Sequence, residues 1–235
     1  MSDVQTQWIE IASDGGKTFS GYLALPPAGS GPGLVLIQEI WGVNRHIRAV
    51  AEQYALDGYV VLAPDVFWRQ EERVDLDYDE DGTAKAFRMM QAADVEQSGL
   101  DMAQAVDRLR ARPEVTGKVA AMGYCMGGRL AFRAAASGKP DAAVCYYGGG
   151  IQNSLELAPQ VTAPILFHFA GLDKHIPPEA VASVRGAFAD HREATIHEYP
   201  NADHGFNCWA RPAYHQPSSA LAHGRTLEFL ARHLG

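Results

Sequence analysis

The sequence predicts an α/β fold with a mostly parallel sheet and helices on both of its faces. Short apolar stretches of strand length alternate with amphipathic stretches of helix length along the chain, and strands joined by helices pair in parallel. The run 34–37 is apolar at every position, which is typical of a strand buried on both faces. With 235 residues, 47% of them hydrophobic, the chain can bury one large core, so we expect residues 1–235 to form a single domain.

Strands are predicted where short apolar runs are bounded by turn residues. The first two flank the turn-rich sequence Ser-Asp-Gly-Gly at 13–16, which suits a hairpin. The third follows a segment rich in proline and glycine, and the fourth begins after Gly58. In chain order, the predicted strands are 8–12, 18–25, 34–37, 59–63, 118–122, 142–147, 164–170 and 194–199.

Helices are predicted between these strands where apolar residues recur three or four positions apart. Asn44 is a good N-cap for the first helix, and Gly58 ends it. The second carries its apolar residues between Leu100 and Leu109 and stops before Pro113. In chain order, the predicted helices are 47–55, 100–109, 130–136, 179–189 and 218–234.

The segment 123–128, Gly-Tyr-Cys-Met-Gly-Gly, has the form of a nucleophile elbow with cysteine as its central residue. A predicted strand enters it and a predicted helix leaves it, so the backbone must turn sharply between them. Gly123 and Gly127 leave room for that turn where a Cβ atom would clash. The positive end of the helix favours a thiolate at Cys125, which predicts covalent chemistry.

Two partners for Cys125 follow later strands. Asp173 comes just after the strand 164–170, and His204 just after the strand 194–199. The order nucleophile, acid, histidine is that of the α/β-hydrolase triad. Cys125 would attack a carbonyl, His204 would carry the proton, and Asp173 would orient the imidazole. Backbone N–H groups of Met126 and Ile40 would hold the oxyanion.

Each role also has an ordinary structural alternative. The cysteine could be a small buried hydrophobe, and His204 a surface or core histidine. Asp173 could stabilise a turn, with Asp203 as the orienter instead. The other histidines, including His168 and His175, are interpreted as structural. No His, Cys or Glu spacing matches a metal-ligand set, so we expect no metal and no cofactor.

Composition excludes some partners. The formal charge of −8 gives no basic surface for nucleic acid or anionic membrane. No apolar run approaches the roughly 18 residues needed to span a bilayer. The three cysteines, with no secretory leader, do not suggest a disulfide framework. We therefore expect a soluble, cytoplasmic protein that acts on a small-molecule ester or lactone; its oligomeric state does not follow from the sequence.

The chain resembles the dienelactone hydrolase family, which includes the carboxymethylenebutenolidases. The resemblance rests on Gln38-Glu39-Ile40-Trp41-Gly42-Val43-Asn44, Pro64-Asp65, the elbow, and the loops of Asp173 and His204. It implies hydrolysis of a carboxylic ester or lactone through an acyl-cysteine intermediate. It also implies that Glu39 helps to activate the thiol, and a carboxylate at a strand end near a sulfur could act as a local base. The alternative for Glu39 is a solvated loop acid.

The resemblance breaks where the dienelactone enzymes clamp the substrate carboxylate with two arginines. The corresponding positions here are Thr83 and Cys208, and neither can pair with a carboxylate as a guanidinium does. The acidic segment 71–81 would repel anions if it overhangs the site. We therefore predict altered specificity, with small neutral esters and uncharged lactones preferred over dienelactone. Candidates that could replace the arginines are Lys85, Arg69, Arg88 and Arg211, and candidate pocket aromatics are Trp41, Trp68, Phe87, Tyr147, Phe206 and Trp209.

Two alternative functions stay open. Within enzymes, the chain could be a broad esterase or thioesterase of neutral substrates. Outside enzymes, it could be a thiol-based sensor or a binding scaffold, since a cysteine in a positive niche oxidises readily. A sensor needs no acid–base relay, so the presence of both His204 and Asp173 argues against it.

Overall fold

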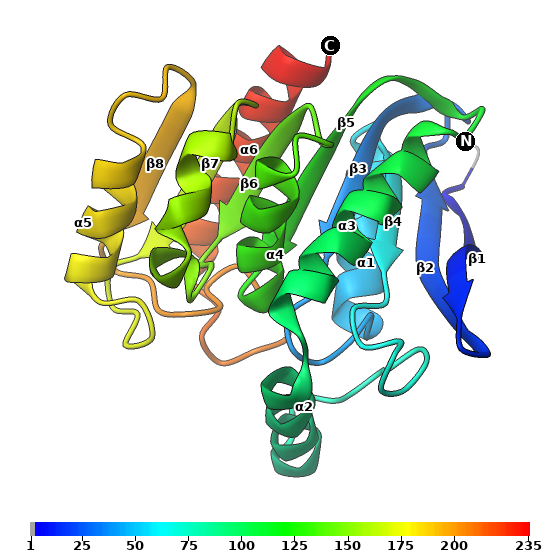
Figure 1. The fold of residues 1–235 in the computed structure, drawn as a ribbon, viewed down its shortest axis with the longest axis horizontal. Coiled ribbons are helices and arrows are strands. Elements are labelled where there is room, and N and C mark those ends of the chain that lie inside the picture. The colour runs from blue at the N-terminus through cyan, green and yellow to red at the C-terminus, as the bar shows by residue number, and fades with distance from the viewer. Residues whose placement is uncertain (1–2) are drawn as a thin grey trace.

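Eight strands form one mixed sheet in the computed structural model, which describes residues 3–235 (Figure 1). Their order across the sheet is β1-β2-β4-β3-β5-β6-β7-β8. Strands β1 and β2 form the antiparallel hairpin, β2 also pairs antiparallel with β4, and all other pairs are parallel. The strands are β1 (Gln5–Asp14), β2 (Lys17–Leu25), β3 (Gly31–Ile37), β4 (Val60–Pro64), β5 (Val115–Tyr124), β6 (Ala142–Tyr146), β7 (Ile165–Ala170) and β8 (Ala194–Tyr199).

Helices cover both faces of this sheet, which confirms the predicted fold class (Figure 1). Helices α3 and α4 pack against each other and against β3 and β5 on one face, and α1 and α6 cover the other. The α-helices are α1 (Arg45–Leu56), α2 (Glu80–Ala92), α3 (Val95–Arg110), α4 (Met126–Ala136), α5 (Pro178–Ala187) and α6 (Gln216–Leu234). Two short 3₁₀ helices, η1 (Ile151–Asn153) and η2 (Leu155–Gln160), follow β6.

The predicted strands and helices all occur, with ends displaced by a few residues. Helix α2 was not predicted. It projects from the body of the molecule (Figure 1), and only Ala86 and Met89 of its side chains are buried. A helix with so narrow an apolar face gives little hydrophobic periodicity in the sequence. Its start is set locally, because the Asp79 side chain accepts the backbone N–H of Gly82 at 2.8 Å.

The parallel strands bring the predicted site residues to one edge. In register, Ile37 of β3 lies beside Gly123 of β5, and Tyr124 lies beside Tyr146 of β6. Strand β6 in turn pairs with β7, and β7 with β8. The loops that follow β3, β5, β7 and β8 therefore gather at the carboxyl ends of neighbouring strands, where α/β sheets place their ligand sites.

Helix α6 is joined to the sheet by a buried polar network centred on Thr226. Its hydroxyl lies 2.7 Å from the Tyr146 hydroxyl and 3.0 Å from Nε2 of His168. The other nitrogen of His168 lies 2.8 Å from the Tyr199 hydroxyl. Every polar atom of this histidine ring is thus satisfied, and burial holds its pKa well below the ordinary value. His168 is a neutral, structural residue.

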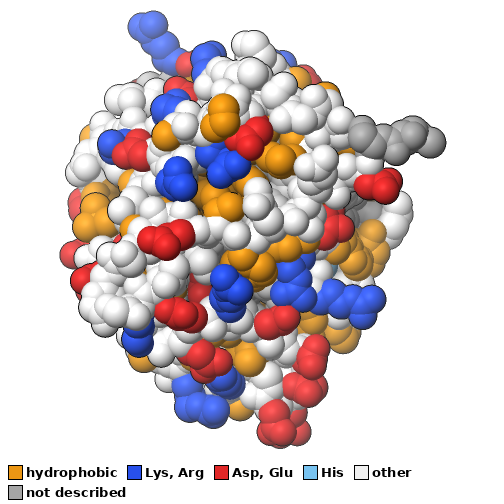
Figure 2. Space-filling model, turned by 90° about the vertical axis from the view of Figure 1, so that its right-hand side faces the viewer, with side chains coloured by type: hydrophobic (Ala, Val, Ile, Leu, Met, Phe, Trp, Pro, Cys, Tyr) orange, Lys and Arg blue, Asp and Glu red, His pale blue; other side chains and the backbone are white. Residues whose placement is uncertain are grey.

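The surface that carries the β1–β2 hairpin shows acidic and basic side chains side by side (Figure 2). The acidic segment 71–81 is partly neutralised by ion pairs with basic residues, such as Arg48 with Asp75 at 2.8 Å. Among residues 3–235, no helix is both long enough and apolar enough to cross a membrane.

Candidate active site

Cys125 occupies a strained turn between β5 and α4. Its φ angle is +56°, in the left-handed region that non-glycine residues rarely adopt. The flanking glycines explain how the chain turns there. A Cβ atom on Gly123 would lie 2.2 Å from the Gly127 carbonyl oxygen, and one on Gly127 would lie 2.4 Å from the Gln38 oxygen. The elbow thus closes only with glycine at both positions.

His204 and Asp173 lie together in the structure, facing Cys125. Nδ1 of His204 donates a hydrogen bond to Oδ2 of Asp173 at 2.7 Å. The other Asp173 oxygen accepts the backbone N–H groups of His175 at 2.8 Å and Ile176 at 3.2 Å, which fixes the carboxylate. The His204 ring also interacts with the Cys125 sulfur. The carboxylate is thus bonded to the imidazole, and the sulfur acts on the imidazole electrostatically.

The charges of Cys125 and Asp173 favour a protonated His204 imidazole. Burial alone lowers the pKa of His204, but the Cys125 sulfur and the Asp173 carboxylate outweigh it and raise the pKa to about 10. For Asp173, burial raises the pKa, and the hydrogen bond from His204 overcomes this and lowers it. The pair is thus suited to hold a proton beside a thiolate.

Neighbouring residues hold the histidine in place. Oδ1 of Asp203 accepts the backbone N–H of His204 at 2.7 Å, so this aspartate fixes the loop while Asp173 bonds the ring. The Tyr147 ring packs on the imidazole with a centroid distance of 5.1 Å, and Phe206 packs on Tyr147 at 5.4 Å. Both aromatic residues are buried, and they support His204 from within the protein.

Glu39 is buried in a network of its own. Its Oε1 lies 3.0 Å from Nη1 of Arg211, and its Oε2 accepts the Tyr78 hydroxyl at 3.4 Å. The Cys208 thiol in turn donates to the Tyr78 oxygen at 3.5 Å. Burial raises the pKa of Glu39, whereas Arg211 and then His204 act to lower it. Glu39 is thus a desolvated carboxyl group within the field of the imidazole, and it is not a solvated loop acid.

Arg211 reaches Glu39 through a space left by glycine. A Cβ atom on Gly205, whose φ is +85°, would lie 2.4 Å from Nη1 of Arg211. The guanidinium also lies over the Trp41 ring, 4.7 Å from its centroid. Nε1 of Trp41 donates to the Thr83 hydroxyl at 3.2 Å, which joins α2 to this arrangement.

A cavity of about 510 Å³ opens above Cys125. Its walls come from the loop after β3, from α2 and the start of α3, from the beginning of α4, and from the segment after β6. The lining residues are Ile40, Trp41, Phe87, Met90, Gln91, Ala93, Val95, Cys125, Met126, Arg129, Gly149, Gly150, Gln152, Asn153, His175, His204 and Arg211. A cavity of this size fits a small organic molecule.

The positions expected to form the oxyanion hole border this cavity. Met126 and Ile40 both line it. Helix α4 begins at Met126, so this residue's backbone N–H is among those for which the helix supplies no acceptor. A carbonyl oxygen held near Cys125 can therefore meet a free N–H group.

The structure brings only some of the predicted pocket residues to the cavity. Trp41, Phe87 and Arg211 line it, whereas Tyr147 and Phe206 lie buried behind His204. The other five lie elsewhere. Trp68 and Arg69 both bond Asp101 of α3, Arg88 is exposed on α2, Lys85 pairs with Glu71, and Trp209 packs on His46.

The acidic segment 71–81 is also outside the cavity: none of its residues is among those that line it. Glu71 pairs with Lys85, and Asp75 with Arg48. Repulsion of anions by an overhanging acidic loop, one of the reasons to expect neutral substrates, therefore does not apply in this structure.

Among the cavity residues that sequence reasoning missed, two have ionisable side chains, His175 and Arg129. His175, interpreted as structural, lines the cavity and packs edge-on against His204 at 5.1 Å. Arg129 lies one helical turn after Cys125 and also lines the cavity. Its position four residues after Cys125 is the signal that could have identified it.

The fold and this arrangement of side chains define an α/β-hydrolase. The chain belongs to the dienelactone hydrolase family, a family of hydrolases whose model matches residues 19–234. It is 34% identical over 224 residues to carboxymethylenebutenolidase 1 of Cupriavidus pinatubonensis, covering 95% of each chain. It is 36% identical over 227 residues to the Pseudomonas putida carboxymethylenebutenolidase, covering 96% of each. A crystal structure from Klebsiella pneumoniae, provisionally described as a dienelactone hydrolase, superposes with a TM-score of 0.86 at 28% identity, covering 97% of this chain and 99% of that one.

Proposed function

We propose that this protein hydrolyses a carboxylic ester or lactone, with Cys125 as the nucleophile and His204 and Asp173 as its acid–base relay. The observation that carries the proposal is that Cys125 and His204 both line the cavity and that His204 is bonded to Asp173 behind it. Nδ1 of His204 lies 2.7 Å from Asp173, and the ring interacts with the Cys125 sulfur. Membership of a hydrolase family, and relatives named as carboxymethylenebutenolidases, support the same reaction class.

In the first half of the reaction, the Cys125 sulfur bonds to the substrate carbonyl carbon. The carbonyl oxygen becomes an oxyanion, which the N–H groups of Met126 and Ile40 stabilise. As this intermediate collapses, the bond to the ester oxygen breaks and His204 gives that oxygen its proton. With a lactone, the released hydroxyl remains attached to the acyl group.

In the second half, water replaces the alcohol. His204 takes a proton from water, and the hydroxide formed attacks the acyl-cysteine carbonyl. The sulfur–carbon bond breaks, the acid is released, and the thiolate and imidazolium are restored. Asp173 stays ionised throughout and keeps the imidazole in the tautomer that exposes Nε2 to the cavity.

Glu39 is proposed to take part in thiol activation. The carboxyl group is desolvated and lies within the field of His204, so its ionisation responds to charge at the site. Arg211 is the group that holds its charge in the present arrangement, at 3.0 Å. A substrate that alters this ion pair would change the basicity of Glu39, which lies within the field of His204.

The specificity is proposed to differ from that of relatives that clamp a carboxylate with two arginines. At one of the two positions, the Thr83 hydroxyl accepts a hydrogen bond from Trp41. At the other, Cys208 is buried against Tyr78. Neither position offers a cation, so a carboxylate placed there would lose charge-assisted hydrogen bonds worth about 1.5–3 kcal/mol each.

Two alternatives make different predictions. A broad esterase or thioesterase would turn over neutral esters and thioesters with similar efficiency, and the apolar side chains of Trp41, Phe87 and Met90 in the cavity wall are compatible with it. A thiol sensor would bind or oxidise at Cys125 without turnover. The fixed contact between His204 and Asp173 favours the enzyme.

The test is a panel of lactones, neutral esters and thioesters, assayed with wild type, Cys125→Ala, His204→Ala and the double variant. Each single variant should lose most activity, and the double variant should be scarcely worse, because relay members act as a unit. Iodoacetamide near neutral pH should label Cys125 first and abolish turnover, as shown by mass spectrometry. Labelling of Cys145 or Cys208 first, with activity intact, would remove Cys125 as the nucleophile.

A further inference from the structure

Arg129 is a partly buried arginine in the cavity wall, and the Cys125 sulfur acts on it electrostatically. Across residues 3–235, no carboxylate forms an ion pair with it, and its buried Nε atom has no hydrogen-bond partner. Burial, and then the neighbouring Arg133, lower its pKa from the ordinary value, and the Cys125 sulfur opposes them. A desolvated arginine that no carboxylate pairs with costs free energy, so an anion carried by a ligand would be stabilised here.

The backbone opposite is shaped to receive this side chain. Gly150 has a φ of +91°, and a Cβ atom there would lie 2.9 Å from Nη1 of Arg129. The guanidinium is therefore seated against the segment after β6, next to Gln152 and Asn153, which also line the cavity. It lies against the backbone of Gly150, at one end of the cavity.

The charge of the cavity favours an anion at this place. None of the residues that line it is an aspartate or glutamate. The second lining arginine, Arg211, is already neutralised by Glu39 at 3.0 Å. Arg133, one turn further along α4, adds positive charge, and its guanidinium donates to the Ser154 hydroxyl at 3.0 Å rather than to an acid.

We propose that Arg129 is a specificity-determining residue that binds a carboxylate carried by the substrate, at the end of the cavity between α4 and η1. This rests on the proposed ester or lactone hydrolysis at Cys125. A planar guanidinium matches the two oxygens of a carboxylate. The substrate class is thus an ester or lactone that carries a carboxylate away from its reacting carbonyl, with the apolar part against Trp41 and α2.

The first test compares matched substrates that differ in one carboxylate. Ethyl butyrate and monoethyl succinate have the same four-carbon acyl backbone, and ethyl hexanoate and monoethyl adipate give a longer pair. For wild type, Arg129→Met and Arg129→Lys, acid release gives kcat/KM for each ester. The measured quantity is the ratio of the carboxylated to the neutral ester.

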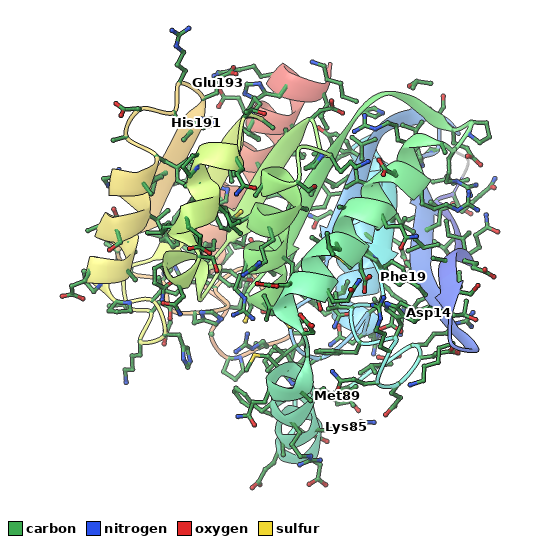
Figure 3. The ribbon with its side chains drawn as sticks, in the orientation of Figure 1. Asp14, Phe19, Lys85, Met89, His191 and Glu193 are labelled. Atoms are coloured by element: carbon green, nitrogen blue, oxygen red, sulfur yellow. The ribbon has the colours of Figure 1, made fainter. Side chains whose placement is uncertain are left out.

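Arg129→Met should lower this ratio by about tenfold or more for at least one pair, as expected for a lost charge-assisted hydrogen bond. Arg129→Lys should retain part of the preference, because it keeps the charge but not the planar fork. Arg192→Met is the matched control. It removes the same charge from the loop between His191 and Glu193, at the far end of the molecule from α2 (Figure 3), and should leave the ratio unchanged.

A second readout does not depend on turnover. Iodoacetate and iodoacetamide alkylate a thiol by the same displacement of iodide, and only iodoacetate carries a carboxylate. The ratio of their rates at Cys125, mapped by mass spectrometry, should fall in Arg129→Met. If wild type hydrolyses none of the esters but its alkylation ratio still falls in Arg129→Met, the proposed function is wrong and the anion subsite is retained.

The proposal is overturned if Arg129→Met leaves both ratios within twofold of wild type. It is also overturned if the variant lowers the rates of the neutral and carboxylated members equally. Equal losses would mean that Arg129 acts on the Cys125 thiolate and not on the substrate.

Discussion

The backbone of Gly205 passes so close to Arg211 that a Cβ atom on this glycine would lie 2.4 Å from Nη1 of the arginine. Gly205 directly follows His204, so one residue links the position of the imidazole to that of the guanidinium that pairs with Glu39. A side chain at Gly205 would therefore require the Arg211 guanidinium to shift from its present contact with Glu39.

The first prediction is that Gly205→Ala lowers kcat/KM by about tenfold or more and reduces the midpoint of thermal unfolding. The methyl group forces Arg211 away from Glu39, and alanine is also strained at a φ of +85°. Gly186→Ala is the control, because nothing lies within 4 Å of its added Cβ atom on α5. In an Arg211→Ala background the clash is absent and only the backbone strain remains, so the same glycine substitution should cost less activity than in wild type. A full additional loss would assign the effect to strain alone.

The second prediction concerns the pH dependence of acylation. Arg211 lowers the pKa of Glu39, so Arg211→Met should raise that pKa further and move the acidic limb of the kcat/KM profile to higher pH. Glu39→Gln, which cannot ionise, should remove that limb. Stopped-flow acylation of Cys125 over a pH series checks both variants. A profile that is the same in all three proteins would reduce Glu39 to a structural residue.

The third prediction is that Cys125→Ala lowers the pKa of His204. In wild type that pKa is about 10, because the Cys125 sulfur and Asp173 overcome the effect of burial. Without the sulfur, only Asp173 opposes burial, so the ring should lose its proton at a lower pH. NMR titration of the ring protons measures the shift directly. An unchanged titration would show that sulfur and imidazole do not interact in solution.

The fourth prediction separates the two neighbouring aspartates. Asp173→Asn should reduce kcat by at least about a hundredfold, because the ring loses the carboxylate that fixes its tautomer and stabilises its charge. Asp203→Asn should change kcat by less than about threefold. The Asp203 contact to the backbone N–H of His204 uses an oxygen that asparagine retains. A larger loss in the second variant would make Asp203 the orienter.

The parts of the site that local sequence determines could be predicted. Gly123 and Gly127 must lack side chains because each approaches backbone within the elbow itself or in the adjacent β3 loop. The elbow is therefore visible in a few consecutive letters. The order of strands placed Asp173 and His204 at the same edge for a similar reason, since parallel strands joined by helices end on one side.

Residues that depend on distant contacts could not be assigned from the sequence. Arg69 and Arg211 looked equivalent as candidate cations, but Arg69 pairs with Asp101 of α3, whereas the loop after β8 carries Arg211 back to Glu39. Trp68 likewise bonds Asp101 at 3.0 Å and is buried away from the cavity. Such pairings follow from how loops cross the sheet edge, which no local periodicity records.

Thr226 lies on the last helix of the chain to be synthesised, and the polar network of the sheet depends on it. During synthesis Cys125 emerges well before His204, and α6 follows later still. Until α6 docks, the buried hydroxyl of Tyr146 and Nε2 of His168 lack the partner that Thr226 supplies. The growing chain can therefore complete the polar network that joins β6, β7 and β8 only when α6 is in place. The packing of the strands that precede Asp173 and His204 thus depends on the last helix of the chain.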